Sequence, residues 1–310
     1  MSDVFISYSR KNADFARRLI DKLTKVNKDS WVDWEDIDFT TNWWDEIKEG
    51  IEKADNFVFI MSQDSMESFV CNLEVDYAIS LSKRIIPIIY ENVEPEKAIA
   101  SIAVFKPHEG LQELLEDRDQ VDIVRANWKR LSHINWISFG EKDDFDKALK
   151  QLLTTIEKDL KYVKAHTRYL SRAKEWYGSD KKTNKRNRRS DLLLFGKEID
   201  IAEAWLKQAD EFAAKLVTNK KEVANPLAKD IQRKYISESR AADKQRKRLA
   251  NSVRASIAIL ALVLIGGGIF SYVTLSGLNT QIDSANSELA VANQGGTEAN
   301  NLLAEATEAL

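Results

Sequence analysis

The sequence is poor in cysteine, histidine and proline. Its 310 residues include one cysteine, three histidines and four prolines. The single cysteine, Cys71, excludes an internal disulfide and a cysteine-rich zinc site, and it suits a reducing compartment. We interpret Cys71 as a small packed hydrophobe. Because His108, His133 and His166 are isolated from one another along the chain, we expect no metal site.

Several common catalytic signatures are also missing. The chain has no glycine-rich loop that ends in Gly-Lys-Ser/Thr, and no Gly-x-Gly-x-x-Gly follows the first predicted strand. It has no Gly-x-Ser-x-Gly nucleophile elbow. The start, MSDVFISYSRKN, lacks the charged and then apolar regions of a signal peptide. We see no internal repeat.

Basic residues are absent from the last part of the chain. The net charge is −11 over residues 1–160, +13 over residues 161–254 and −5 over residues 255–310, where there is no Lys or Arg. Residues 255–276, ASIAILALVLIGGGIFSYVTLS, are uncharged. As a helix they are long enough to cross a hydrocarbon core of about 30 Å, and a buried soluble helix is the alternative. The positive-inside rule predicts a cytoplasmic N-terminal part and an extracytoplasmic tail, residues 277–310.

Short apolar strands alternate with helical segments over the first 140 residues. We predict five strands: Asp3–Tyr8, Ser30–Trp34, Asn56–Ser62, Arg84–Tyr90 and Ile134–Phe139. Two segments between them have helical spacing, with these residues directed inward: Phe15, Leu19, Ile20, Leu23, Ile47 and Ile51. Continuous Val, Ile and Phe strands alternating with helices indicate an α/β fold with a parallel sheet covered on both faces. Ligands bind such sheets beyond the carboxyl ends of the strands.

The rest of the chain is predicted to be helical. One long helix from about Asp144 to Trp176 leaves the sheet, and a basic loop, Lys181–Arg189, follows it. A second helix has one predicted inward face, formed by Ile201, Trp205, Ala209, Phe212 and Leu216. Asn225-Pro226 is typical of a helix start, and we expect the helix that begins there to continue into the membrane span. The predicted organisation is therefore a sheet domain (1–143), a basic helical connector (144–254), a transmembrane helix (255–276) and a short tail (277–310).

One carboxylate lies among apolar residues. The helix that starts at Ser68 has an apolar face at spacings of three and four, formed by Phe69, Val70, Leu73, Tyr77 and Leu81, and Glu74 borders this face. A carboxylate in such surroundings costs free energy unless a partner satisfies it or a function uses it. Helix spacing alone leaves two interpretations open: Glu74 reaches water at the edge of the face, or it has a functional role.

Four motifs in this order resemble a TIR (Toll/interleukin-1 receptor-like) domain of the bacterial kind: DVFISYSRKN, WVDWEDIDFTTNWWDEI, ADNFVFIMSQDSMES and CNLEVDYAISLSKRIIPII. The resemblance covers about residues 1–140 and implies a flavodoxin-like, five-stranded parallel sheet. The basic middle, with RAKEW and LLLFGKEIDIAEAWL, more loosely resembles the connector of bacterial TIR proteins that carry further domains.

The resemblance implies an NAD+ nucleosidase that uses NAD+ as substrate and needs no cofactor. Enzymes of this family cleave the nicotinamide–ribosyl bond with one glutamate, which by motif is Glu74. By the same alignment Tyr8 and Ser9 match a nucleotide-contacting loop, Arg10 is placed to pair with the pyrophosphate, and Asp38 matches a polar contact. Trp34, Trp43 and Trp44 are candidates to stack on a base, and anchoring of the loop is the alternative for them.

One position departs from the family pattern. Many active members carry tryptophan four residues before the glutamate, where this chain has Val70.

Together, the resemblance and the apolar stretch imply a membrane-anchored NAD+ nucleosidase that is active on clustering through TIR self-association, in bacterial defence or stress signalling. A non-catalytic TIR scaffold is the alternative. The basic residues are expected to attract membrane lipid rather than nucleic acid.

Overall fold

The structure, a computed structural model, describes residues 2–31, 43–107, 109–115, 117–178, 190–219 and 225–308. The chain divides into two compact units, residues 1–243 and 244–310. The first unit contains the sheet and three hydrophobic cores. The described part of the second unit belongs to a single helix.

Five parallel strands form the sheet in the order β2-β1-β3-β4-β5. They are β1 (Val4–Ser7), β2 (Ser30–Trp31), β3 (Asn56–Met61), β4 (Arg84–Ile89) and β5 (Ile137–Ser138). This confirms the predicted flavodoxin-like parallel sheet. Strands β1, β3, β4 and β5 are shorter than predicted, and β5 pairs over two residues only. Residues 32–34 of the second predicted strand lie outside the described residues. Before β5, Trp136 is 37% exposed, and its indole Nε1 donates a hydrogen bond to the Leu131 carbonyl at 2.7 Å.

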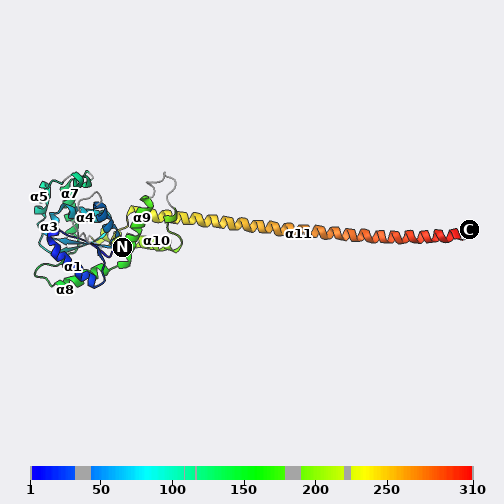
Figure 1. Ribbon diagram of the computed structural model, residues 1–310, viewed down its shortest axis with the longest axis horizontal. Coiled ribbons are helices and arrows are strands. Elements are labelled where there is room, and N and C mark those ends of the chain that lie inside the picture. The colour runs from blue at the N-terminus through cyan, green and yellow to red at the C-terminus, as the bar shows by residue number, and fades with distance from the viewer. Residues whose placement is uncertain are drawn as a thin grey trace. The chain divides into compact units, whose positions relative to one another are not determined.

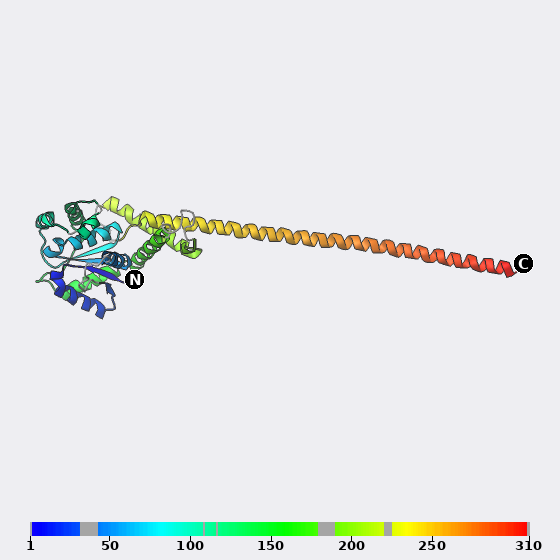
Figure 2. The ribbon, with the colours of Figure 1, turned by 45° about the horizontal axis from the view of Figure 1, so that its top comes forward.

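Alternate residues of the central strands face two separate cores, as the period of a strand requires. Val58 and Ile60 of β3 face the core under α1 (Ala13–Lys25) and α8 (Phe145–Glu157). The other face of β3 supplies the core under α2 (Trp43–Lys53), α4 (Phe69–Ser80) and α7 (Gln120–Leu131). Figures 1 and 2 show α1 and α8 on one side of the sheet and α4 on the other. The inward residues predicted for α1 and α2 are all buried.

Helix α4 is buried on more than one side, which corrects the prediction of a single apolar face. Its outer side is covered by α7, where the Asn127 side chain donates a hydrogen bond to the Asn72 carbonyl at 2.8 Å. No helix was predicted between β4 and β5. The structure has α5 (Pro95–Val104), α6 (Glu109–Gln112) and α7 there. The other short elements are α3 (Gln63–Met66) and the 3-10 turns η1 (Arg10–Asn12), η2 (Glu113–Leu115) and η4 (Ser190–Leu192).

The long helix predicted from Asp144 to Trp176 is broken in two. Helix α8 ends at Glu157, and α9 (Leu160–Gly178) begins after an extended Lys158 and an Asp159 with a positive φ of 51°. Arg84, at the start of β4, donates hydrogen bonds to the carbonyls of Thr155 and Lys158 at 3.2 and 2.5 Å. The break lets α8 pack on the sheet while α9 packs into a third core.

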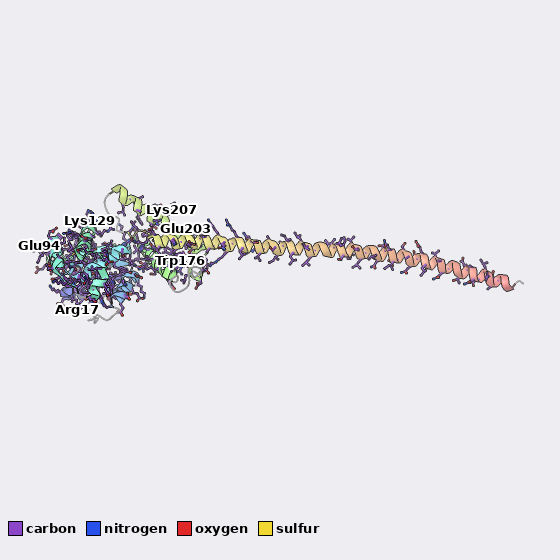
Figure 3. The ribbon with its side chains drawn as sticks, turned by 90° about the horizontal axis from the view of Figure 1, so that it is seen from above. Arg17, Glu94, Lys129, Trp176, Glu203 and Lys207 are labelled. Atoms are coloured by element: carbon purple, nitrogen blue, oxygen red, sulfur yellow. The ribbon has the colours of Figure 1, made fainter. Side chains whose placement is uncertain are left out.

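The third core joins α9, α10 (Lys197–Asn219) and the first residues of α11 (Asp230–Glu308). Trp176 and Trp205 are 1% and 5% exposed, and Figure 3 labels Trp176 together with Glu203 and Lys207 of α10. Ile201 was predicted to face inward but is 58% exposed. Trp205 and Ala209 of the predicted face are buried, and Phe212 packs against the same core, so the prediction is wrong at the start of α10, where Ile199 and Ala202 are buried.

The predicted helix start at Asn225-Pro226 is wrong, because α11 begins at Asp230. The Asn225 side chain accepts a hydrogen bond from Arg84 and donates one to Asp159 at 2.9 Å. The Pro226 carbonyl accepts from the Tyr162 hydroxyl at 2.6 Å. The predicted continuity is confirmed, since α11 runs without a break to Glu308. It contains the one described stretch long and apolar enough to cross a membrane.

Candidate functional site

A cleft lies at the carboxyl end of β1, where the chain order of the sheet reverses between β1 and β3. Such reversals are where open α/β sheets bind ligands. The cleft has a volume of about 380 Å³, within the usual range for small-molecule sites. Its walls come from the end of β1 and the residues that follow it, from Trp43 at the start of α2, and from the first turns of α4.

Glu74 lines the cleft and is 6% exposed. The hydroxyl of Ser7, the last residue of β1, donates a hydrogen bond to Glu74 Oε2 at 2.5 Å, in the range of strong bonds to carboxylates. Glu74 therefore does not reach water at a helix edge, and that interpretation of its position is wrong. One carboxylate oxygen is held by β1 while the side chain borders the cleft.

Four residues predicted for the site meet at this cleft: Tyr8, Ser9, Arg10 and Trp43 line it together with Glu74. Trp44 packs into the core instead, where its ring centroid lies 6.1 Å from that of Tyr77. The remaining two predicted residues, Trp34 and Asp38, lie outside the described residues.

The loop that follows β1 is tied to the loop that follows β3. The Ser62 hydroxyl, which is fully buried, donates a hydrogen bond to Asn12 Oδ1 at 2.6 Å. Ser62 also forms a capping box with Ser65 at the start of α3. At the surface Lys11 pairs with Asp64 at 2.7 Å. These contacts fix the position of Tyr8, Ser9 and Arg10 relative to the sheet.

Cys71 lies one turn before Glu74 and is 3% exposed. Its Sγ donates a hydrogen bond to the Tyr8 carbonyl at 3.3 Å. Burial, and then the negative charge of Glu74, raise the pKa of the Cys71 thiol to about 12. The thiol stays neutral near pH 7, so Cys71 packs against the cleft and is a poor nucleophile.

The cleft combines an aromatic wall, a basic rim and one buried carboxylate. Helix α4 begins beside it, and its N-cap, Ser68, accepts from the Cys71 backbone N–H at 3.3 Å. A helix N-terminus and the planar donors of Arg10 both favour an anion such as a phosphate. The Glu74 carboxylate favours positive charge that develops next to it. Among the residues that the structure describes, no three His, Cys, Asp or Glu side chains cluster closely enough to hold a metal ion.

Ser7 is the residue of the site that sequence reasoning missed. It lies inside the first predicted strand, Asp3–Tyr8, and no role was predicted for it. A signal was present, because serine ends an otherwise apolar strand, VFIS, whose four residues are all buried. The paired observation, a buried serine beside a buried glutamate, depends on the fold, since 67 positions separate the two residues.

Part of the chain is similar to known proteins. Residues 4–122 match the family model described as TIR domain. Over 88 residues, 26% of this chain, the sequence is 32% identical to "Putative cyclic ADP-D-ribose synthase TIR2" of Cytobacillus dafuensis. The matched part spans 23% of the length of that relative.

The comparison with solved structures gives two TIR domains at low TM-scores. The TIR domains of the activated Roq1 resistosome that recognises the pathogen effector XopQ are 19% identical, with a TM-score of 0.42, over 50% of this chain and 99% of theirs. The TIR domain of the Toll-related receptor TRR-2 of Hydra magnipapillata is 24% identical, with a TM-score of 0.27, over 43% of this chain and 96% of its own.

Proposed function

The chain carries a TIR domain in residues 4–122, and we propose that this domain cleaves the nicotinamide–ribosyl bond of NAD+. The observation that carries the proposal is the buried Glu74, held at 2.5 Å by Ser7 at the edge of a cleft of about 380 Å³. The cleft suits a ligand with flat rings and a pyrophosphate, because it offers Trp43 and Tyr8 for stacking and Arg10 for the anion.

The proposed chemistry needs only one carboxylate. Glycoside hydrolysis ordinarily requires an acid for the leaving group and a second carboxylate. The nicotinamide of NAD+ is already cationic and leaves as a neutral molecule, so no acid is needed. As the bond from the ring nitrogen to C1′ breaks, positive charge develops on the ribose, and the Glu74 carboxylate stabilises it. Addition of water to C1′ then gives ADP-ribose, and attack by the adenine ring of the same molecule gives a cyclic product.

We further propose that residues 255–276 anchor the domain in a membrane, with residues 1–254 in the cytoplasm. The support is an apolar stretch of α11 whose most apolar window is entirely exposed, preceded by basic residues and followed by none. A membrane confines copies of the chain to a plane, which favours TIR self-association and activity on clustering. The proposed biological role is bacterial defence or stress signalling through loss of NAD+ or release of a cyclic messenger.

The activity test measures NAD+ loss and nicotinamide release by the full chain in lipid vesicles, over a series of protein densities. Glu74→Gln keeps the size of the side chain and an oxygen that accepts from Ser7, but removes the charge. We expect it to abolish turnover, while the matched control, Asp76→Asn on the same helix, keeps it. Asp76 pairs with Arg118 at 2.8 Å away from the cleft. Equal activity of Glu74→Gln and the native chain contradicts the proposal.

The topology test uses trypsin, which cuts after Lys and Arg. Residues 255–310 contain neither, so trypsin can cut only on the N-terminal side of the span. We expect the chain to stay intact when protease is added to sealed spheroplasts, and to be cut in inverted vesicles. Cleavage in spheroplasts reverses the proposed orientation.

The alternative function is a TIR scaffold that binds other TIR domains without catalysis. The observation that favours it is Val70, which lines the cleft at the position where many TIR enzymes carry tryptophan. A scaffold leaves NAD+ intact even when copies are forced together in the membrane, and Glu74→Gln then changes neither NAD+ level nor TIR association. Activity of the native chain that depends on Glu74 excludes this alternative.

A further inference from the structure

The last part of α11 carries a seven-residue repeat. Reading from Leu278, successive sevens are LNTQIDS, ANSELAV, ANQGGTE and ANNLLAE, and Asn recurs at 279, 286, 293 and 300. This corrects the view from the sequence that the chain has no internal repeat. The repeat was hidden because three of its four leading residues are alanine, which gives a weak hydrophobic signal.

In helical form the repeat builds one apolar stripe with alternating steps of three and four residues. In heptad notation the a positions are Leu275, Ile282, Leu289 and Gly296, and the d positions are Leu278, Ala285, Ala292 and Ala299. The large members are 50% to 62% exposed: Leu275, Leu278, Ile282 and Leu289. Figure 3 shows the side chains of this part of α11 standing away from the helix on all sides.

The strict period distinguishes this stripe from an ordinary surface pattern. A straight helix has 3.6 residues per turn, so a seven-residue repeat drifts about 20° per heptad around it. The stripe stays on one line only if the helix supercoils around another helix that has the same repeat. A flat membrane surface or a globular partner gives no reason to keep the period at seven over four heptads.

The charges are arranged for a second copy of this chain. The tail has five acidic residues and no basic ones, so two parallel copies would repel if carboxylates flanked the seam. All four e positions from 279 to 300 are Asn. Among the g positions of residues 275–303, Glu288 is the one acidic residue. Asp283 and Glu298 lie at b and c, on the outside of such a pair. If the partner were a basic helix, we would expect acidic residues at the e and g positions of α11, where they would face the partner's positive charges.

The stripe continues into the predicted membrane span. Stepping back by sevens from Leu275, the a positions are Gly268 and Ala261, which are small enough for two helices to approach closely in lipid. In the proposed single-span topology, two copies leave the membrane in the same direction and at the same depth. Equivalent heptads then face one another without a shift in register.

We infer that residues 275–306 are a parallel coiled-coil seam through which two copies of this chain pair outside the membrane. The occupant of the stripe is the same stripe of the second copy, with Leu or Ile layers from 275 to 289 and smaller Ala and Gly layers among them and after them. The inference is independent of NAD+ cleavage. Its parallel orientation rests on the proposed membrane anchor, whose failure the trypsin test reports separately.

Cysteine crosslinking of the full chain tests the seam. The native Cys71 is buried, so it gives a low background. We compare Ala292→Cys, at a d position, with Gln294→Cys, at an f position, in vesicles with excess lipid under mild oxidation. We expect Ala292→Cys to shift from 35.4 kDa to twice that mass on a non-reducing gel, and Gln294→Cys to stay single. Equal crosslinking at the two positions, or none at either, overturns the inference.

A second comparison measures mass in detergent without any crosslink. The double variant I282E/L289E puts two carboxylates in the seam, and the matched control S284E/V291E puts the same two charges at c positions. We expect the native chain and the control to remain paired and I282E/L289E to fall to one chain per particle. Pairing that survives I282E/L289E, or that S284E/V291E also breaks, contradicts a seam on this face.

Discussion

Replacement of Ser7 by alanine is the sharpest test of the proposed active site. The Ser7 hydroxyl reaches Glu74 Oε2 at 2.5 Å, and both side chains are buried. Ser7 is not among the residues that line the cleft, so we expect it to act through Glu74 rather than by contact with the ligand. The change therefore removes the support of the proposed catalytic carboxylate and leaves the binding walls in place.

The expected size of the effect follows from the type of bond. A hydrogen bond to a charged group contributes about 1.5 to 3 kcal/mol, and each 1.4 kcal/mol is tenfold in rate, so kcat should fall about 10- to 150-fold. KM for NAD+ should change little, because the contacts of Tyr8, Arg10 and Trp43 are kept. Ser7→Thr retains a hydroxyl and suits a strand, so it should recover much of the lost activity.

The assay is nicotinamide release at a series of NAD+ concentrations, with the chain in lipid. Ser80→Ala, at the far end of α4, is the matched control, because its hydroxyl donates a hydrogen bond to the carbonyl of Tyr77 one turn back, in the same helix. Circular dichroism before and after heating reports whether each variant folds. An unchanged kcat in a folded Ser7→Ala chain, or a rise in KM alone, refutes the assigned role of Ser7.

Three further predictions concern stability and reactivity. Gly50→Ala should lower the free energy of unfolding in urea by about 1 to 3 kcal/mol, since its Cβ would lie 2.8 Å from the Trp31 ring, whereas Gly178→Ala, with nothing within 4 Å, should not. Burial, and then the charge of Lys83, lower the pKa of His166 to about 3 from an unfolded value near 6.5. The unfolded chain then binds the extra proton, so stability should fall by up to about 1.4 kcal/mol per pH unit below pH 6.5, a slope that acid titration of His166→Phe should lack. Cys71, with its pKa raised to about 12, should resist a thiol reagent at pH 8 until denaturant is added, and rapid labelling of the folded chain would contradict its burial.

Patterns of apolar residues predicted the sheet, and the resemblance to TIR domains predicted much of the site. Continuous apolar runs marked the central strands, and the TIR-like motifs pointed to Tyr8, Trp43 and Glu74, which line one cleft in the structure. The burial of Glu74 was left open, because helix spacing describes one helix and cannot show that the end of β1 lies against Glu74. Ser7 was missed for a related reason, since its partner is supplied by the tertiary fold.

Two predictions for the helical part are wrong because contacts with distant residues decide the local structure. Asn225-Pro226 has the composition of a helix start, yet Asn225 binds Arg84 and Asp159. The break between α8 and α9 contains neither Gly nor Pro, so nothing in its composition announced it. It is held by Arg84, more than 70 positions away, whose guanidinium takes the carbonyls that the break leaves unpaired.

That same arginine determines where the chain can be shortened. Arg84 is 2% exposed, and its described partners all come from residues 155–225. A chain that stops at the end of the recognisable TIR motifs would leave a buried cation without acceptors, and would also uncover the sheet face that α8 protects. Activity lost by such a fragment would report misfolding rather than a missing regulator. Residues 1–243 form one compact unit that keeps the acceptors of Arg84 and the helix α8.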